Sequence, residues 1–527
     1  MPQKHGFLPR GLAAAGEAKS KQTPGQWGAK FGRLFPDLPA AHYGASEHES
    51  KANLALLAKA MISDLDEPKD GADGEESGIP ALYTYFGQFI DHDLTFDPNG
   101  SFAKQKDPSA VTDFRTPAFD LDNLYGRGPG DQPYLYEDDG KSLRLGDPLT
   151  MGSPGAMDLQ RNAAGRALIG DPRNDENSIV SQLQGLMIRF HNGLVKRFPQ
   201  AAFEEVQAMV RHHYQYVVVN DFLARIVRPD VLDGLKTDGH YDKARINFFK
   251  GFPAPYDAPF MPVEFSVAAY RLGHSMVRPG YRLNDTVLLP IFPIPVHAKP
   301  GFPEGLTGFR RMISDWAIDW GRFIDIDERD YGLQPDPTKV SDGLTPVQEV
   351  ENFRRLQFAY RIDTALVNPL VRLPLSVADN PPASLAARNL ERGLEFGLPT
   401  GQAVAAAMGA PVLDDKDILI GQAVPGAKTT KIAEIAGGAF ANNCPLWTYV
   451  LAEAMHGPMQ DTPIAVKGGK VVTTPQLGPV GGRIVAEVFL GLLFADKGSY
   501  LHMHPAWTPP EGPDYRLKDL VAAALAS

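Results

Sequence analysis

Residues 79–94 constrain the fold of this chain more than any other segment. The stretch has no proline beyond its second residue, and it predicts a helix. Residues four apart share one face of a helix, so Gln88 and His92 would line the same side. Asp91 and Asp93 flank His92 and diverge from it by roughly 100° each, which leaves each carboxylate free for a different partner. The segment indicates one wall of an active site. The alternative is a solvated, charged helix end.

Four more segments complete an ordered set with residues 79–94. They are TPAFDLDNLYG (116–126), LIGDPRNDE (168–176), YRLGH (270–274) and NLERGLEFGLP (389–399). The set resembles the animal-type haem peroxidases of the peroxidase–cyclooxygenase superfamily. The likeness covers about residues 79–411 and continues more weakly to Trp507. It implies a mainly α-helical fold, a single large haem peroxidase domain with long ordered loops and little β structure.

The resemblance makes His274 the ligand of the iron of haem b and Asn389 its hydrogen-bond partner. A neutral imidazole is a stronger axial donor when its second nitrogen donates a proton to an acceptor. Gly273 would leave room for a flat macrocycle, and the alternative is a buried core histidine. Arg271 and Arg392 are candidates for the haem propionates, because a guanidinium matches a carboxylate bidentately. The alternative for both arginines is an ordinary surface ion pair.

On the opposite face of the haem, hydrogen peroxide must lose a proton from one oxygen and gain it on the other. His92 suits this exchange, because its ordinary pKa near roughly 6.5 allows it to act as base and then as acid. Arg173 would supply a fixed positive charge for the departing oxygen. Gln88 would hold water, peroxide or a small anion, unless it is only a polar residue of the helix.

Asp91 and Glu176 occupy the positions at which mammalian family members form ester bonds to haem methyl groups. Covalent attachment of haem is therefore expected to be possible here. The next residue is Asn177, where one mammalian member carries a methionine that forms a third, sulfonium bond. Asparagine cannot form that bond. We therefore expect bromide, iodide, thiocyanate or organic donors rather than chloride as substrates.

An acidic loop after residue 115 offers oxygen ligands at alternate positions. Calcium takes roughly six to eight such oxygens. With Asp93 closing the shell, three carboxylates would neutralise the ion one residue from the distal histidine. The alternative is a solvated acidic turn. The proposed calcium ligands of the loop are the hydroxyl and carbonyl of Thr116, the carbonyl of Ala118, and the carboxylates of Asp120 and Asp122.

Three other histidines are predicted to have structural roles. His212 and His213 are adjacent on a predicted helix, so their side chains point apart and a shared metal ion is not expected. His191 follows the Arg173 segment on another predicted helix, and we expect it to make a polar contact within the helix packing.

Helical periodicity recurs along the chain, and no regular alternation suggests a large sheet. Glycine and proline collect between the periodic stretches, as in 288–305 and 401–425, which indicates long loops. We expect residues 1–75 to form an arm and a first helix packed on the body, and residues 76–527 to form the catalytic domain. The predicted helices are 52–65, 79–94, 178–198, 203–227, 265–276, 309–320, 347–363, 385–395, 446–456 and 481–493.

The composition of the chain limits its binding partners and the cellular compartment that we expect for it. The 52 basic and 63 acidic residues give a net charge of −11, which provides no basic surface for nucleic acid. No run of about 18 apolar residues could span a membrane, and the first fifteen residues lack the apolar core of a secretory leader. Cys444 is the only cysteine, so no intrachain disulfide can form. We therefore expect a cytoplasmic protein, with leaderless export as the alternative. The sequence does not indicate an oligomeric state.

Three functions remain to be compared. The leading one is a peroxidase that uses hydrogen peroxide to oxidise small-molecule electron donors. The second is a fatty-acid dioxygenase of the same superfamily, whose members place a radical tyrosine three residues before the proximal histidine. Here that position holds Arg271, and Tyr270 lies one residue earlier, about 100° away on a helix. The third is a haem-binding protein without turnover, for which His92, Arg173 and Gln88 would be unnecessary.

Overall fold

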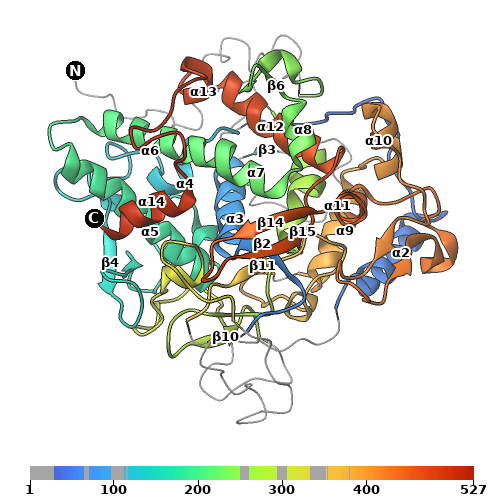
Figure 1. Cartoon of the computed structure of the whole chain (residues 1–527), viewed down its shortest axis with the longest axis horizontal. Coiled ribbons are helices and arrows are strands. Elements are labelled where there is room, and N and C mark those ends of the chain that lie inside the picture. The colour runs from blue at the N-terminus through green and yellow to red at the C-terminus, as the bar shows by residue number, and fades with distance from the viewer. Residues whose placement is uncertain are drawn as a thin grey trace.

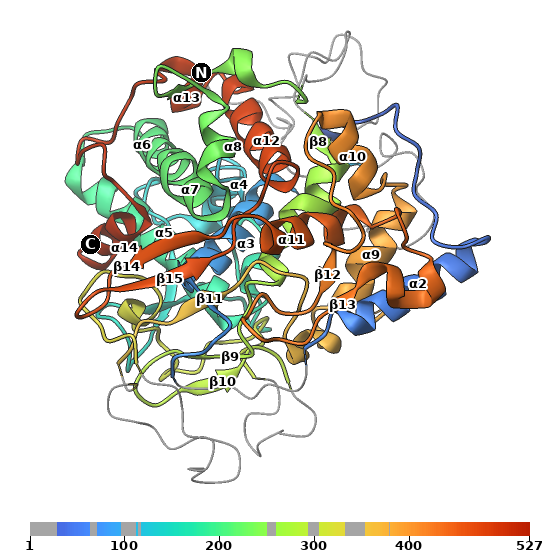
Figure 2. The same cartoon turned by 45° about the vertical axis from the view of Figure 1, so that its right-hand side comes forward.

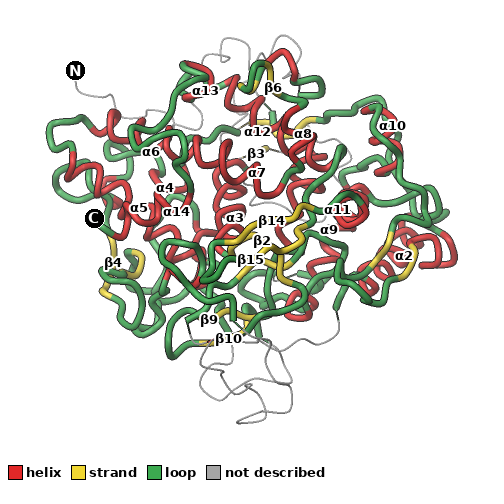
Figure 3. The backbone as a smooth tube through the Cα atoms, viewed as in Figure 1, coloured by secondary structure: helices red, strands yellow, loops and turns green. Residues whose placement is uncertain are grey.

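The chain is mainly helical, as predicted. In the computed structural model, helices and loops dominate, and the strands are short and scattered (Figure 3). The largest sheet among the described residues has three strands, in the order β3-β1-β8. The structure describes residues 29–63, 71–95, 112–113, 117–249, 260–293, 305–332, 352, 354–378 and 380–527.

The described helices and strands have the following bounds. The helices are α2 (Glu47–Ala60), α3 (Leu82–Leu94), α4 (Asp122–Tyr125), α5 (Ser178–Arg197), α6 (Phe203–Val217), α7 (Leu223–Ile226), α8 (Pro229–Asp233), α9 (Leu385–Glu395), α10 (Gly401–Met408), α11 (Leu446–His456), α12 (Gly481–Ala495), α13 (Tyr500–Met503) and α14 (Leu517–Leu525). The strands are β1 (Ala29–Gly32), β2 (Glu76–Pro80), β3 (Thr112–Asp113), β4 (Leu145–Pro148), β5 (Met157–Leu159), β6 (Lys236–Thr237), β7 (His240–Tyr241), β8 (Met261–Pro262), β9 (Gly280–Arg282), β10 (Leu288–Pro290), β11 (Phe358–Tyr360), β12 (Leu419–Ile420), β13 (Thr430–Lys431), β14 (Gln460–Ile464) and β15 (Lys470–Thr474).

Helix α3 lies in the middle of the molecule (Figures 1 and 2). It packs on α5 and on a 3₁₀ turn, Ala269–His274, and this turn packs in turn on α11 and α12. Ten of the thirteen residues of α3 are buried. They include Phe86 and Phe89, whose rings both contact the Tyr214 ring of α6 edge-to-face. Because α3 is covered on nearly every side, the polar groups that it carries must find their partners inside the protein.

A buried ion cluster joins the segment before α3 to the segment after His274. Glu76 of β2 accepts hydrogen bonds from Arg278 and Arg355, with 2.7 Å between Arg355 Nη2 and Glu76 Oε2. All three side chains are buried. Removing one partner of such a cluster costs about 3–5 kcal/mol, because the remaining charge is left uncompensated. The cluster therefore holds the two segments together firmly.

Two predicted helices are irregular at the cavity described below. The helix predicted over 203–227 consists of α6 and α7 joined by a π-helical turn, Val218–Phe222. The helix predicted over 265–276 is a π-helical turn, Glu264–Ala268, followed directly by the 3₁₀ turn that ends at His274. Irregular helical turns of this kind are frequent at functional sites.

The prediction of a helix over 309–320 is wrong. Phe309 has a left-handed backbone (φ 56°), and its N–H donates to Asp175 O at 2.6 Å instead of starting a helix. Met312 N donates to an oxygen of Asp158 at 3.0 Å. The stretch is a loop because its backbone groups bond to distant segments, and apolar spacing alone does not reveal such partners.

The predictions over 347–363 and 401–425 are also wrong in part. Within the first range the described residues include strand β11, which pairs antiparallel with β2, whereas residues 347–351 and 353 lie outside the described residues. The second range was expected to be loop but begins with α10, which is capped by the Thr400 side chain.

The N-terminal part of the described chain contributes α2, which packs on α9. The division of the chain at residue 75 stays a prediction. Among the helices that the structure describes, none is both long and apolar enough to cross a membrane.

Candidate active site

A cavity of about 310 Å³ lies between α3 and the 3₁₀ turn that carries His274. Its volume is within the range of roughly 300–1,000 Å³ that is usual for ligand pockets. It brings together polar residues from α3, from 173–177, from the 3₁₀ turn and from α9, and an apolar group from two later segments. The polar residues are Gln88, Asp91, His92, Arg173, Glu176, Asn177, Arg271, His274 and Arg388, and the apolar group is Ile291, Phe292, Leu370, Leu373, Val377 and Leu385.

His92 is buried in the cavity wall, with 4% of its surface exposed. Its Nδ1 lies 2.7 Å from Oδ1 of Asn174. Burial, reinforced by the positive charge of Arg173, lowers the pKa of His92 to about 4. The imidazole is therefore neutral near pH 7 and can accept a proton through Nε2.

Arg173 also lines the cavity, but much of its hydrogen-bonding capacity serves the protein. Its Nε and Nη2 contact the carboxylate of Asp171, with Nη2 2.8 Å from Oδ2. Nη2 also donates to the backbone oxygens of His92, at 3.2 Å, and Thr95. Arg173 thus anchors the end of α3, and Asp171 balances part of the charge that we expected it to offer to peroxide.

Gln88 is held between two neighbours in the cavity wall. Its Nε2 donates to Oε1 of Glu176, and its Oε1 accepts from Nδ2 of Asn177 at 3.3 Å. Burial raises the pKa of Glu176 to about 7. Asn177 has a second role, because its Oδ1 accepts from the backbone N–H groups of Ile179 and Val180 and so caps α5.

His274 and Asn389 meet as predicted, with the Asn389 amide nitrogen 2.8 Å from Nδ1 of the histidine. The two orientations of an asparagine amide have the same shape. The orientation that turns the carbonyl oxygen toward Nδ1 lets Nδ1 donate and leaves Nε2 without a proton, as a metal ligand requires. Burial, with the charge of Arg271, lowers the pKa of His274 to about 3.

The structure places the predicted propionate ligands differently. Arg271 lines the cavity, and its Nε donates to Ser266 O at 2.8 Å. Arg392 is not part of the cavity wall formed by the described residues, and its guanidinium lies 5.4 Å from the centre of the Phe396 ring. Arg388, one turn earlier on α9, reaches the wall instead.

The sequence reasoning missed Arg388 and Asn174. Asn174 lies inside the motif LIGDPRNDE next to Arg173, so its position was a usable signal. Arg388 immediately precedes Asn389 and lies four residues before Arg392, on the same face of the helix. Sequence spacing alone did not show which of the two arginines faces the cavity.

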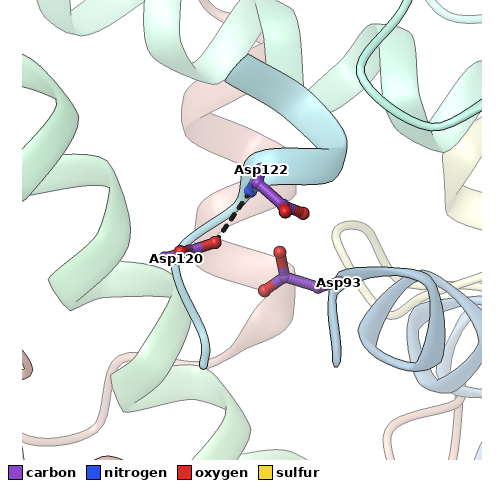
Figure 4. A group of neighbouring side chains, drawn as sticks. All are labelled: Asp93, Asp120 and Asp122. Carbon is purple, nitrogen blue, oxygen red and sulfur yellow. Dashed lines mark hydrogen bonds between the residues drawn. The ribbon is translucent and has the colours of Figure 1, made fainter. Parts of the chain in front are cut away.

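Three carboxylates gather at the end of α3 (Figure 4). Oxygens of Asp93, Asp120 and Asp122 all lie within 4.8 Å of one another, and Asp120 Oδ1 accepts from Asp122 N at 3.1 Å. Ala118 is buried in the same loop, whereas Thr116 lies outside the described residues. Oxygen ligands at this spacing suit a hard cation such as calcium.

The other histidines have separate partners, which agrees with structural roles. His212 Nε2 lies 3.1 Å from Gly498 O, whereas His213 Nε2 lies 3.2 Å from a Glu511 oxygen. His191 is buried, with Nδ1 3.0 Å from the Tyr125 hydroxyl and Nε2 2.8 Å from Lys141 O.

Part of the chain is similar to known protein sequences. Residues 100–299 match the family model described as animal haem peroxidase. Thyroid peroxidase of Homo sapiens is 24% identical over 246 residues, which are 44% of this chain and 21% of that protein. Peroxidasin of Drosophila melanogaster is 23% identical over 372 residues, which are 68% of this chain and 20% of that protein. Over residues 100–299 this chain is similar to the animal haem peroxidases. The animal haem peroxidase family is one that implies haem, and the chain matches about a fifth of the length of these two relatives.

Solved structures share the expected fold with this chain. Peroxidase A of Dictyostelium discoideum superimposes with a TM-score of 0.61 at 14% identity, over 98% of this chain and 97% of that one. Fatty acid alpha-dioxygenase of Oryza sativa gives a TM-score of 0.52 at 16% identity, over 95% of this chain and 79% of that one. At these identities the likeness establishes the fold alone.

Proposed function

We propose that this chain is a haem-dependent peroxidase that uses hydrogen peroxide to oxidise small organic donors and anions such as bromide, iodide or thiocyanate. The observation that carries the proposal is one cavity that holds two histidines in different settings. His92 is neutral and pairs with Asn174, whereas His274 pairs with Asn389. The first pair suits a base and the second suits an axial ligand.

The residues of the cavity fit haem. His274 would ligate the iron, and Arg271 and Arg388, which line the cavity, would meet the haem carboxylates. The Arg388 guanidinium also donates to the backbone oxygens of Asn380 and Pro382. A Cβ built on Gly273 finds nothing within 4 Å, so this part of the wall is open to a flat group. When bound, haem would supply the iron and porphyrin that exchange electrons with peroxide and donors.

The distal residues would manage the protons of peroxide. Nε2 of His92 accepts the proton of the first peroxide oxygen and returns it to the second, which leaves as water. This use of one group as base and then acid contributes roughly 10²–10⁴ to a rate. Gln88, fixed by Glu176 and Asn177, would orient peroxide or water in the cavity.

Two further features belong to the proposal. Asp91 and Glu176 both line the cavity, and we propose that they can form ester bonds to haem. The cluster of Asp93, Asp120 and Asp122 would hold calcium. Three carboxylates this close repel one another unless a cation lies between them, so the ion would stabilise the end of α3.

The proposal is tested with haem-loaded protein. Wild type should show a ferric haem spectrum that changes on addition of peroxide, and His92→Ala should slow this reaction by about a hundredfold or more. His191→Ala, which removes another buried histidine, is the matched control for loss of stability. Equal peroxide reactivity in wild type and His92→Ala would remove His92 from the mechanism.

A fatty-acid dioxygenase is the second candidate, favoured by the fold shared with the Oryza sativa enzyme and by Tyr270 in the cavity wall. The Tyr270 hydroxyl donates to Gly87 O at 3.1 Å. Oxygen uptake with a fatty acid separates the two candidates. For a peroxidase, Tyr270→Phe leaves peroxide turnover of donors intact and fatty acid causes no oxygen uptake. For a dioxygenase, uptake occurs and disappears in Tyr270→Phe.

A further inference from the structure

A chain of buried amides connects His92 to a backbone carbonyl. Oδ1 of Asn174 lies 2.7 Å from Nδ1 of His92, and Nδ2 of Asn174 donates to Oε1 of Gln184 at 2.8 Å. Nε2 of Gln184 then donates to the backbone oxygen of Asn123 at 3.3 Å. Asn174 and Gln184 have no exposed surface. Buried amides are tolerated only where they are hydrogen-bonded, so this chain is a fixed part of the interior.

The last member of the chain fixes the orientation of all the others. A backbone carbonyl can only accept, so Gln184 must turn Nε2 toward Asn123. Its Oε1 then faces Asn174 and accepts, so Asn174 must offer Nδ2 there and keep Oδ1 for His92. An amide oxygen also only accepts. Nδ1 of His92 therefore carries the proton, and Nε2 keeps a lone pair.

The chain returns to the helix that carries His92. Nδ2 of Asn123 donates to Phe89 O at 3.0 Å, three residues before His92 on α3. Asn123 O also accepts from Asp171 N at 3.2 Å. Both ends of the amide chain are thus tied to α3. This arrangement keeps the distance between the His92 imidazole and the Asn174 amide constant.

We infer that Asn174 and Gln184 are positioning residues that hold His92 in the tautomer with a protonated Nδ1, so that Nε2 can take the proton of peroxide. The catalytic use of Nε2 rests on the proposed function. The tautomer itself does not, because the hydrogen bonds that set it involve protein groups alone.

The rate of cyanide binding to the ferric haem protein tests the inference without turnover. Hydrogen cyanide binds as an anion and must give up its proton to a nearby base, whereas carbon monoxide binds ferrous haem without a proton transfer. Asn174→Leu should slow cyanide association by about tenfold to a hundredfold, a part of the roughly 10²–10⁴ available from acid–base catalysis. Carbon monoxide association should stay within about twofold of wild type in the same variant.

Three further variants separate positioning from loss of structure. Asn174→Ser keeps a hydroxyl that can accept from His92 and donate to Gln184, so it should recover a large part of the rate that Asn174→Leu loses. Gln184→Met should slow cyanide but not carbon monoxide. Gln182→Met is the matched control, because Gln182 is also buried on α5 but bonds to Trp316 and Ile318 instead of the His92 chain. It should leave both rates unchanged.

The tautomer is read directly from ¹⁵N spectra of histidine-labelled full-length protein, in which the His92 signals are assigned by their loss in His92→Gln. We expect a protonated Nδ1 in the wild type. An unprotonated Nδ1, or cyanide association at the wild-type rate in Asn174→Leu, overturns the inference. If wild type takes up no haem, the proposed function fails, and the ¹⁵N spectrum still decides the tautomer.

Discussion

Replacing Gly170 by alanine should damage the distal site from a position outside it. A Cβ at this position would meet the carbonyl of Asp122 and would lie 2.6 Å from Asn123 O. Ordinary contact begins near 3.4 Å, so the two segments must separate by at least 0.8 Å (3.4 minus 2.6) at Asn123 O, and by more at Asp122 O, which lies closer. Asn123 O is the acceptor for both Gln184 and Asp171 N, and a shift of this size weakens both bonds.

We expect two measurable effects of Gly170→Ala. Overpacking costs about 1–3 kcal/mol in unfolding free energy. A displacement near 1 Å of the support of a catalytic group can cost up to about a hundredfold in rate, so peroxide reactivity should fall by roughly ten- to a hundredfold. Stopped-flow spectra with peroxide and urea unfolding measure the two.

Gly185→Ala is the control for this prediction. Gly185 lies within α5, and its Cβ would be 3.6 Å from the nearest atom, Met157 O, so the methyl group fits. This variant should keep its activity and gain up to about 1 kcal/mol from helix propensity. If Gly170→Ala behaved like Gly185→Ala, the close approach of 170 to 122–123 would not support the site, and the reasoning would be refuted.

Other predictions concern haem, pH and calcium. Gly273→Ala should leave the stability of haem-free protein unchanged and weaken haem binding, measured by titration, and equal affinity in the variant would contradict the placement of haem against Gly273. Burial lowers the pKa of His191 from 6.5 to about 4, so its contribution to stability is complete above pH 6.5 and is lost as the pH falls from 6.5 to 4. The loss amounts to about 3 kcal/mol at about 1.36 kcal/mol per pH unit. His191→Gln should therefore flatten the pH dependence of the unfolding free energy between pH 4 and 6.5. An unchanged slope in this variant would assign the pH dependence to other groups. After peroxide treatment, acidified organic solvent should leave haem attached to wild type but extract it from the double variant Asp91→Asn, Glu176→Gln, and complete extraction from wild type would exclude the esters. Asp120→Ala or chelation should lower peroxide reactivity, with added calcium restoring only the chelated protein; haem-loaded protein without calcium in elemental analysis would exclude the ion.

Helix α9 could be predicted well because it buries one face and begins at the Ser384 cap. Residues 385–395 and 446–456 were predicted with the observed bounds of α9 and α11. The failures at 309–320 and 347–363 have a common cause. In both places the backbone hydrogen bonds go to segments far away in the chain, Asp175 for the first and β2 for the second. Apolar spacing carries no information about such partners.

The candidate site was likewise predicted only in part from the sequence. The motifs placed His92, Gln88 and His274 in the wall of one cavity, because each lies in a short stretch whose residue types suit the chemistry. They did not show that Asn174 holds His92, since that contact joins residues 82 positions apart. They also did not show that Asp171 shares the charge of Arg173. Contacts of this kind depend on how segments meet, which a single sequence does not state.

The buried cluster of Glu76, Arg278 and Arg355 has a consequence for how a flat cofactor could enter. The cluster ties the start of α3 to the chain just after His274, and the hydroxyl of Tyr270 ties the same two walls together through Gly87 O. Parting these walls would separate the buried charge of Arg278 from the carboxylate of Glu76. The apolar group of the cavity wall contains no ion pair, because its members are Ile291, Phe292, Leu370, Leu373, Val377 and Leu385. Loading of the cofactor should therefore proceed by outward movement of that side, while the spacing between the two histidine-bearing walls stays constant.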